Sequence, residues 1–172
     1  MQKKLATLVD HFAVCRNIWS MVQILFLILI LSTATLLGNE LSIGLFIHPV
    51  LARTDHERFL PAIQVFAALF GNVMPFWMAA TLVLHLVLLG FSWNWPAAST
   101  VLLASATLLW VAIIIFSLIG PVPINNRVKA WDLRQLPGDW REQRRRWDRL
   151  HAARVILIAL AFLALVLSYR AL

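Results

Sequence analysis

The chain has 172 residues, of which 61% are hydrophobic and 13% are charged. A soluble domain of this length must spread charge over its surface, so the composition excludes the ordinary soluble class and indicates a single-domain membrane protein. The formal charge of +7 comes from basic residues that lie between apolar stretches, which argues against nucleic acid as a partner and favours anionic lipid headgroups.

Four apolar segments are each long enough to cross the hydrocarbon core of a bilayer, which takes about 20 helical residues. The sequence therefore predicts an all-α fold, an integral membrane four-helix transmembrane bundle that forms one domain over residues 1–172. The first span, residues 18–47, has one charged side chain, Glu40. The other three spans are expected at residues 61–89, 97–119 and 151–167, with an ordered cap loop over residues 120–150.

Basic residues are unevenly shared between the two ends of the predicted bundle. Eight Lys or Arg residues fall between residues 120 and 150, and Arg53 and Arg58 bring that end to ten. The end with the two termini has four, namely Lys3, Lys4, Arg16 and Arg170. Basic residues next to spans mark the cytoplasmic side, so we expect the cap loop in the cytoplasm and both termini outside, in a bacterial inner membrane.

Glu40 lies inside the first predicted span, where an ionised side chain costs roughly 2.5 to 3.5 kcal/mol on insertion scales. Such a carboxyl group needs either a partner or a chemical task, and the sequence leaves both open. Arg154 lies about one turn inside the fourth span and enters from the same end, so it is the natural partner. The alternative is that Arg154 extends toward the lipid headgroups.

Two histidines are expected at the same membrane level, because His48 ends the first predicted span and His151 begins the fourth. Together with Glu40 they could bind a metal ion, since imidazole and carboxylate are common ligands. Histidines at helix ends often coincide without any metal. His85 stands alone on the second span and is interpreted as a packing residue, while Gln64 and Asn72 on that span predict interhelical hydrogen bonds.

The cap segment has a pattern beyond its charge. Arginine runs are usually solvated or lipid-facing, but paired asparagines and regularly placed tryptophans are harder to explain in that way. They predict an ordered cap over the mouth of the bundle, in which indole rings shield a pocket and amides hold a polar ligand. The candidate substrate-binding residues of the cap are Asn125, Asn126, Arg127, Trp131 and Trp147.

These motifs resemble those of the DUF1772 group of membrane proteins, also called the anthrone oxygenase family. The resemblance is strongest in PVPINNRVKAW (121–131) and PGDWREQRRRWDRLHAAR (137–154), and GNELSIGLFIHPVL (38–51) and Gln64 add weaker support. The resemblance implies a four-helix membrane protein, and a few fungal relatives oxidise anthrones to anthraquinones with O2. The cap residues above, His151 and Arg154 lie in the stronger motifs, and Glu40 and His48 lie in a weaker one.

Two functions from different classes remain open at this stage. In the first, the protein is an oxygenase for a lipophilic aromatic or polyketide-like substrate. Glu40 or His151 would be the base, and Arg154 and the two asparagines would stabilise an oxyanion. This reaction requires either no cofactor or a metal bound by His48, His151 and Glu40. In the second, the protein binds a small molecule without catalysis or is a subunit of a complex. Convergence of the candidate residues around one cavity would favour the enzyme.

Overall fold

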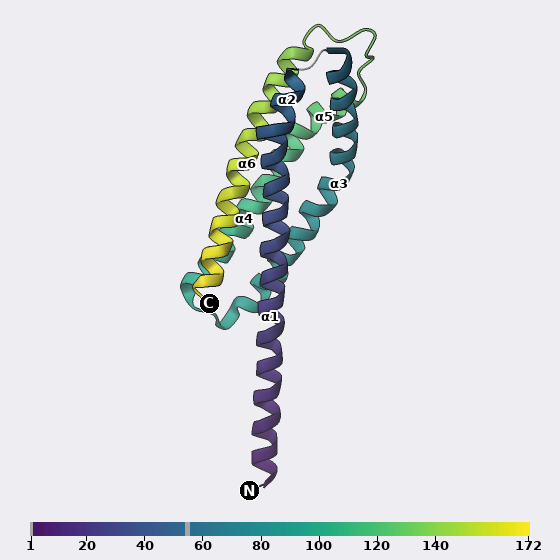
Figure 1. The fold of residues 1–172 in the computed structure, drawn as a ribbon. Helices are drawn as coiled ribbons and strands as arrows, with labels where there is room; N and C mark the ends of the chain where they lie inside the picture. The colour runs from purple at the N-terminus through teal and green to yellow at the C-terminus, as the bar shows by residue number, and fades with distance from the viewer. Residues whose placement is uncertain (1, 54–55) are drawn as a thin grey trace.

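The fold is seen in a computed structural model, which describes the backbone of residues 2–53 and 56–172 and the side chains of residues 16–51, 53 and 59–172. The described backbone is helical throughout, apart from short connections (Figure 1). The elements are α1 (Gln2–Ser42), η1 (Ile43–Ile47), α2 (His48–Ala52), α3 (His56–Phe91), η2 (Ser92–Asn94), α4 (Ala97–Ile119), α5 (Pro121–Lys129) and α6 (Trp140–Arg170).

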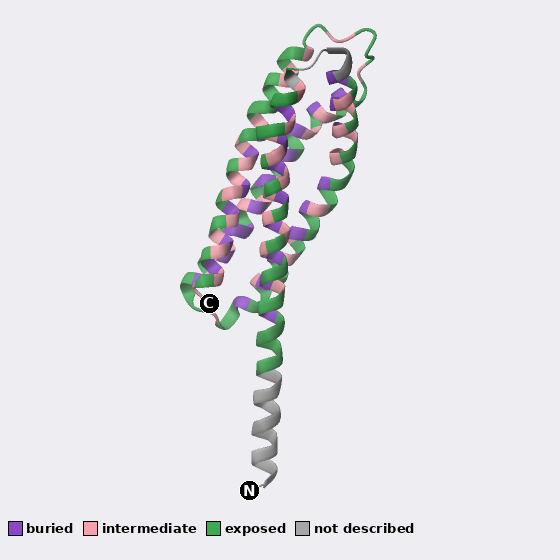
Figure 2. Ribbon diagram, in the orientation of Figure 1, coloured by how far each residue is buried: buried purple, intermediate pink, exposed green. Residues whose placement is uncertain are grey.

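The predicted four-helix membrane fold is confirmed. Four helical stretches are long and apolar enough to cross a membrane, and they cover Arg16–Leu51, Phe59–Asn94, Ala97–Lys129 and Trp140–Arg170. Their outward faces are largely exposed, as Figure 2 shows. Those exposed side chains are apolar, such as Phe76 at 79% and Leu108 at 70% exposure. Because a lipid chain is as apolar as leucine, this surface suits a bilayer and not water.

The core follows one buried stripe on each helix. On α6 the buried residues recur every three or four positions, which is the period of a helix face that packs against its neighbours. They are Trp147, His151, Arg154, Ile158, Ala161, Leu165 and Ser168. From Ile158 to Leu165 this stripe is apolar and packs between the helices. From residue 147 to residue 154 the stripe carries polar groups into the bundle. A functional site is therefore expected at this level of the bundle.

The cap differs from the predicted loop over residues 120–150, because most of it is helical. Pro121–Lys129 forms α5, and α6 begins at Trp140, so only residues 130–139 lie outside helices. The prediction began the fourth span only after the charged residues 141–149, yet Arg, Glu and Gln are good helix formers, so the helix begins earlier. His151 therefore lies well inside α6 and does not begin a helix. His48 likewise does not end one, since the chain continues from η1 into α2.

Gln64 fixes the cap to the bundle. Its side-chain Nε2 atom donates to the backbone oxygens of Val128 at 3.0 Å and Trp131 at 2.8 Å. The Val128 oxygen lies in the last turn of α5, where carbonyl groups lack helical partners. The predicted interhelical bond of Gln64 is thus confirmed. Asn72 differs from its prediction, since it is exposed and makes no hydrogen bond with the described side chains.

Candidate functional site

A buried ion pair joins α1 to α6. The Nη2 atom of Arg154 lies 2.6 Å from Oε2 of Glu40, and the two residues are 8% and 2% exposed. This contact confirms the predicted partner of Glu40, and it means that Arg154 does not extend to the headgroups. Because each charge neutralises the other, loss of one partner would leave an uncompensated charge inside the bundle.

His151 completes this cluster from one helical turn before Arg154. Its Nε2 atom lies 3.0 Å from the backbone oxygen of Glu40, so Nε2 carries the hydrogen and donates it. Its Nδ1 atom lies 3.2 Å from the Glu40 carboxylate and 3.3 Å from Nη2 of Arg154. A methyl group on Gly44 would be 3.3 Å from the imidazole ring, which is a tight contact, so the ring would have to shift slightly to make room for it.

The chain between Glu40 and His48 is wound more widely than an α-helix. Residues Ile43–Ile47 form the π-helical element η1, in which the backbone N–H of His48 donates to the oxygen of Ile43. Such segments are rare and often occur at functional sites, where they change the direction of the side chains around them. Here η1 separates the two polar residues that α1 and α2 present to the cap.

His48 belongs to a second polar group, nearer the surface. Its Nδ1 atom lies 3.3 Å from Oδ1 of Asp148, which is also 3.3 Å from Nη2 of Arg144. The ring of Trp147 contacts both histidines, with centroid distances of 4.5 Å to His48 and 4.6 Å to His151, and the two histidine rings are 6.2 Å apart. Trp147 stacks nearly parallel to His151, so it holds that imidazole in place from the cap side.

The predicted metal set of His48, His151 and Glu40 is not formed. Among the described residues, no three His, Cys, Asp or Glu side chains are grouped so that they could hold a metal ion. The reason is the direction of each side chain. The Glu40 carboxylate is bound to Arg154, and His48 turns its Nδ1 atom toward Asp148. Two residues at the same membrane level can still point their ligand atoms in different directions.

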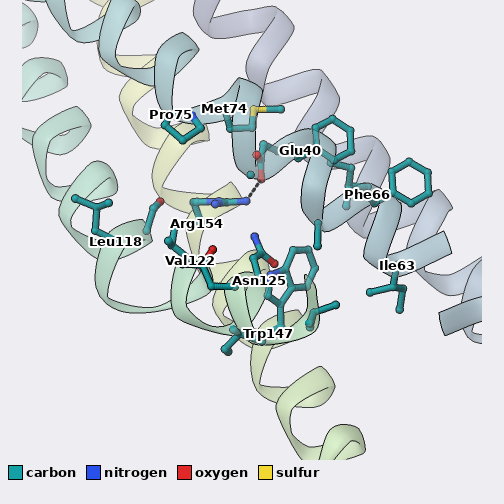
Figure 3. Close-up of a pocket in the computed structure, with 18 of the residues that line it drawn as sticks. Glu40, Ile63, Phe66, Met74, Pro75, Leu118, Val122, Asn125, Trp147 and Arg154 are labelled. Atoms are coloured by element: carbon teal, nitrogen blue, oxygen red, sulfur yellow. Dashed lines mark hydrogen bonds and ion pairs between the residues drawn. The ribbon is translucent and has the colours of Figure 1, made fainter. Parts of the chain in front are cut away.

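A cavity of about 200 Å³ opens beside the ion pair. Glu40 and Arg154 lie at one side of it, next to Asn125 and Trp147, as Figure 3 shows. Asn125 makes no hydrogen bond with the described residues, so its amide is available to a ligand. Most of the rest of the wall is apolar and is formed mainly by Ile63, Phe66, Phe70, Met74, Met78, Ile114 and Leu118. The cavity therefore suits an apolar molecule with one polar edge.

Most of the predicted site residues meet at this cavity. Asn125, Asn126, Trp131 and Trp147 line it together with Glu40, His48 and Arg154. His151 lines a separate groove of about 390 Å³ on the other side of Glu40, between α1 and α6. Arg127 is exposed and lines neither space, so its predicted role in substrate binding is not supported.

Arg144 is a residue that the sequence analysis missed. It lines both the cavity and the groove, and its guanidinium lies 5.6 Å from the ring centre of Trp147 and 5.4 Å from that of Phe59. The signal was its spacing, since Arg144, Trp147, His151 and Arg154 recur every three or four residues and would share one face of a helix. That face was not visible while residues 140–150 were taken as a loop.

Comparison with known proteins identifies a family for this chain. A family model described as anthrone oxygenase matches residues 64–164. No curated protein and no solved structure matches the chain. The matched range begins at Gln64, which anchors the cap, and includes Asn125, Trp147, His151 and Arg154. It begins after Glu40 and His48, which reach the same cavity from α1 and α2.

Proposed function

The chain belongs to the anthrone oxygenase family, and we propose that it is a membrane-embedded oxygenase that oxidises a lipophilic aromatic or polyketide-like substrate with O2. The observation that supports this most directly is a carboxylate and a guanidinium that line a mostly apolar cavity. An apolar wall would bind the rings of the substrate, and the charged groups would act on its one reactive edge.

Glu40 is the base in this proposal. An anthrone has an acidic methylene group between two aromatic rings, and its proton must pass to a group that touches the substrate. Glu40 lines the cavity whereas His151 does not, so the carboxylate is the better placed of the two candidates. Arg154 then holds the carboxylate in position through its 2.6 Å contact with Oε2, while His151 fixes the backbone of Glu40 by donating from Nε2 to the Glu40 carbonyl oxygen.

Asn125 is the leading candidate for the oxyanion contact. When the methylene proton leaves, the negative charge of the anion spreads to the carbonyl oxygen on the opposite side of the central ring. Arg154 is already bound to Glu40 on the base side, at 2.6 Å. The free amide of Asn125 can donate to an oxygen elsewhere in the cavity, and Asn126 lines the same wall. Donors that are in place before charge develops lower the barrier most.

The proposed reaction balances with O2 as the only co-substrate. The anion reduces O2, a carbon–oxygen bond forms, and the proton held by Glu40 returns to give a hydroperoxide. The second methylene hydrogen then leaves as a proton while the oxygen–oxygen bond breaks, which releases water and forms the new carbonyl group. Anthrone and O2 thus give anthraquinone and water, so the substrate itself supplies all the electrons.

We further propose that the cap lies at the cytoplasmic face of a bacterial inner membrane, with the termini outside. The support is the excess of basic residues at the cap end. Several of these side chains on α6 are exposed, among them Arg141, Arg145, Arg146 and Arg149. They would contact anionic lipid headgroups, each with a contribution of about 1 kcal/mol.

The experiment separates catalysis from binding alone. Purified protein in detergent is given anthrone, and oxygen uptake is recorded for the wild type, Glu40→Gln and the control His85→Ala. We expect Glu40→Gln to remove turnover while anthraquinone, the product, still binds and quenches tryptophan fluorescence. His85→Ala should retain both. Binding without oxygen uptake in the wild type would instead favour the non-catalytic function.

A further inference from the structure

The cavity has a rim on the lipid-facing surface of the bundle, between α3 and α4. Pro75 and Ala79 on α3 and Leu118 on α4 all line the cavity. All three are also exposed, Leu118 to 59%. A residue that both lines a cavity and is exposed marks a place where that cavity reaches the surface, and Asn126 on α5 marks another such place at the cap. We refer to Pro75, Ala79 and Leu118 as the rim.

The rim lies at the depth of the lipid chains. Trp93 and Trp95, in and next to η2, mark the membrane interface at the opposite end of the bundle, where aromatic residues gather. Pro75 is about 24 Å from Phe91 along α3, at about 1.5 Å per residue, and Leu118 is about 32 Å from Ala97 along α4. The hydrocarbon core is about 30 Å thick, so Pro75 lies between its middle and its far boundary, and Leu118 lies at about that boundary.

The helix on one side of the rim is weakened there. Pro75 lies inside α3 and has no N–H group, so the carbonyl group of Gly71, one turn earlier, lacks its helical hydrogen-bond partner. Gly71 also lines the cavity. A proline inside a helix is a common cause of a bend, and a bend at this position moves α3 relative to α4.

We infer that the cavity takes its ligand from the hydrocarbon of the membrane, through the rim, and that its substrates are therefore flat, membrane-dissolved molecules with one polar edge. This inference rests on the proposed function. The apolar wall next to the rim would receive the rings first. The polar edge would then stop at Glu40, Arg154 and Asn125, which line the same cavity.

The test compares two matched double variants. The first double variant, the rim variant, combines Ala79→Phe and Leu118→Phe, which place larger side chains at the rim. Val83→Phe with Leu108→Phe adds the same groups at positions that are 57% and 70% exposed on the same two helices but do not line the cavity. Each protein is placed in phosphatidylcholine nanodiscs. Anthraquinone is delivered from protein-free vesicles, and its association is followed by quenching of tryptophan fluorescence.

We expect the rim variant to slow association by at least about tenfold relative to the control variant, because the ligand must wait for a wider opening. Leu118→Ala, which widens the rim, should be as fast as the wild type or faster. Equal rates for the rim and control variants would overturn the entry route while the proposed function stands. A wild type that binds no anthraquinone would instead overturn the proposed function, and this inference with it.

Discussion

The Glu40–Arg154 pair should be strongly coupled in folding, and a double-mutant cycle can measure that coupling. Glu40→Gln leaves Arg154 without its counterion in a position that is 8% exposed. Arg154→Met leaves the carboxylate in a position that is 2% exposed. Each single variant should lose about 3 to 5 kcal/mol of stability, because a stranded buried charge keeps its desolvation penalty.

The double variant removes both charges, so its loss should be smaller than the sum of the two single losses. We expect an interaction energy of about 2 to 3 kcal/mol, at the upper end of the range for contacting residues. The measurement is unfolding in mild detergent, followed by circular dichroism. Because Arg154 also contacts His151, the cycle is repeated in a His151→Ala background. Additive losses in both backgrounds would show that the 2.6 Å contact does not hold the helices together.

Three further predictions concern the surroundings of the pair. Gly44→Ala should destabilise the protein because its methyl group would be 3.3 Å from the His151 ring, whereas Gly38→Ala, with nothing within 4 Å, should not; equal melting temperatures would contradict this. His151→Ala and Asn126→Ala should abolish oxygen uptake with anthrone. His85→Ala should retain it, because His85 is stacked on Trp110 away from the cavity; the same response from all three variants would remove the case for this site. A reporter fused at Leu172 should report an outside location, and cytoplasmic activity there would refute the proposed orientation but not the four spans.

The four spans and the Glu40–Arg154 pair could be predicted from the sequence because a charge inside an apolar run is rare and needs a partner. The His85 prediction was also confirmed, since its ring is buried and stacks on Trp110 at 5.5 Å. The predicted metal set is not assembled among the described residues, for a physical reason. Position along a helix gives the membrane level of a residue, but it does not give the direction of its side chain.

The wall of the cavity could not have been found from the sequence. In a membrane bundle nearly every position is apolar, so residues that face a cavity, such as Phe66 and Met74, look the same as residues that face lipid, such as Val65 and Val73. Arg144 was different, because its spacing from Trp147 was informative. It was missed only because the charged residues 141–149 were taken as part of a loop that precedes the fourth span.

The central claim is that the protein oxidises its substrate with O2 and that the new carbonyl oxygen comes from O2. Isotope labelling tests this most directly. The purified protein is incubated with anthrone under 18O2, and the anthraquinone is analysed by mass spectrometry, with Glu40→Gln as the blank for uncatalysed oxidation. The account predicts one 18O atom in each anthraquinone, formed by the wild type well above the blank, and no label when 18O is supplied in water. Unlabelled anthraquinone under 18O2, or equal product from Glu40→Gln, would contradict it.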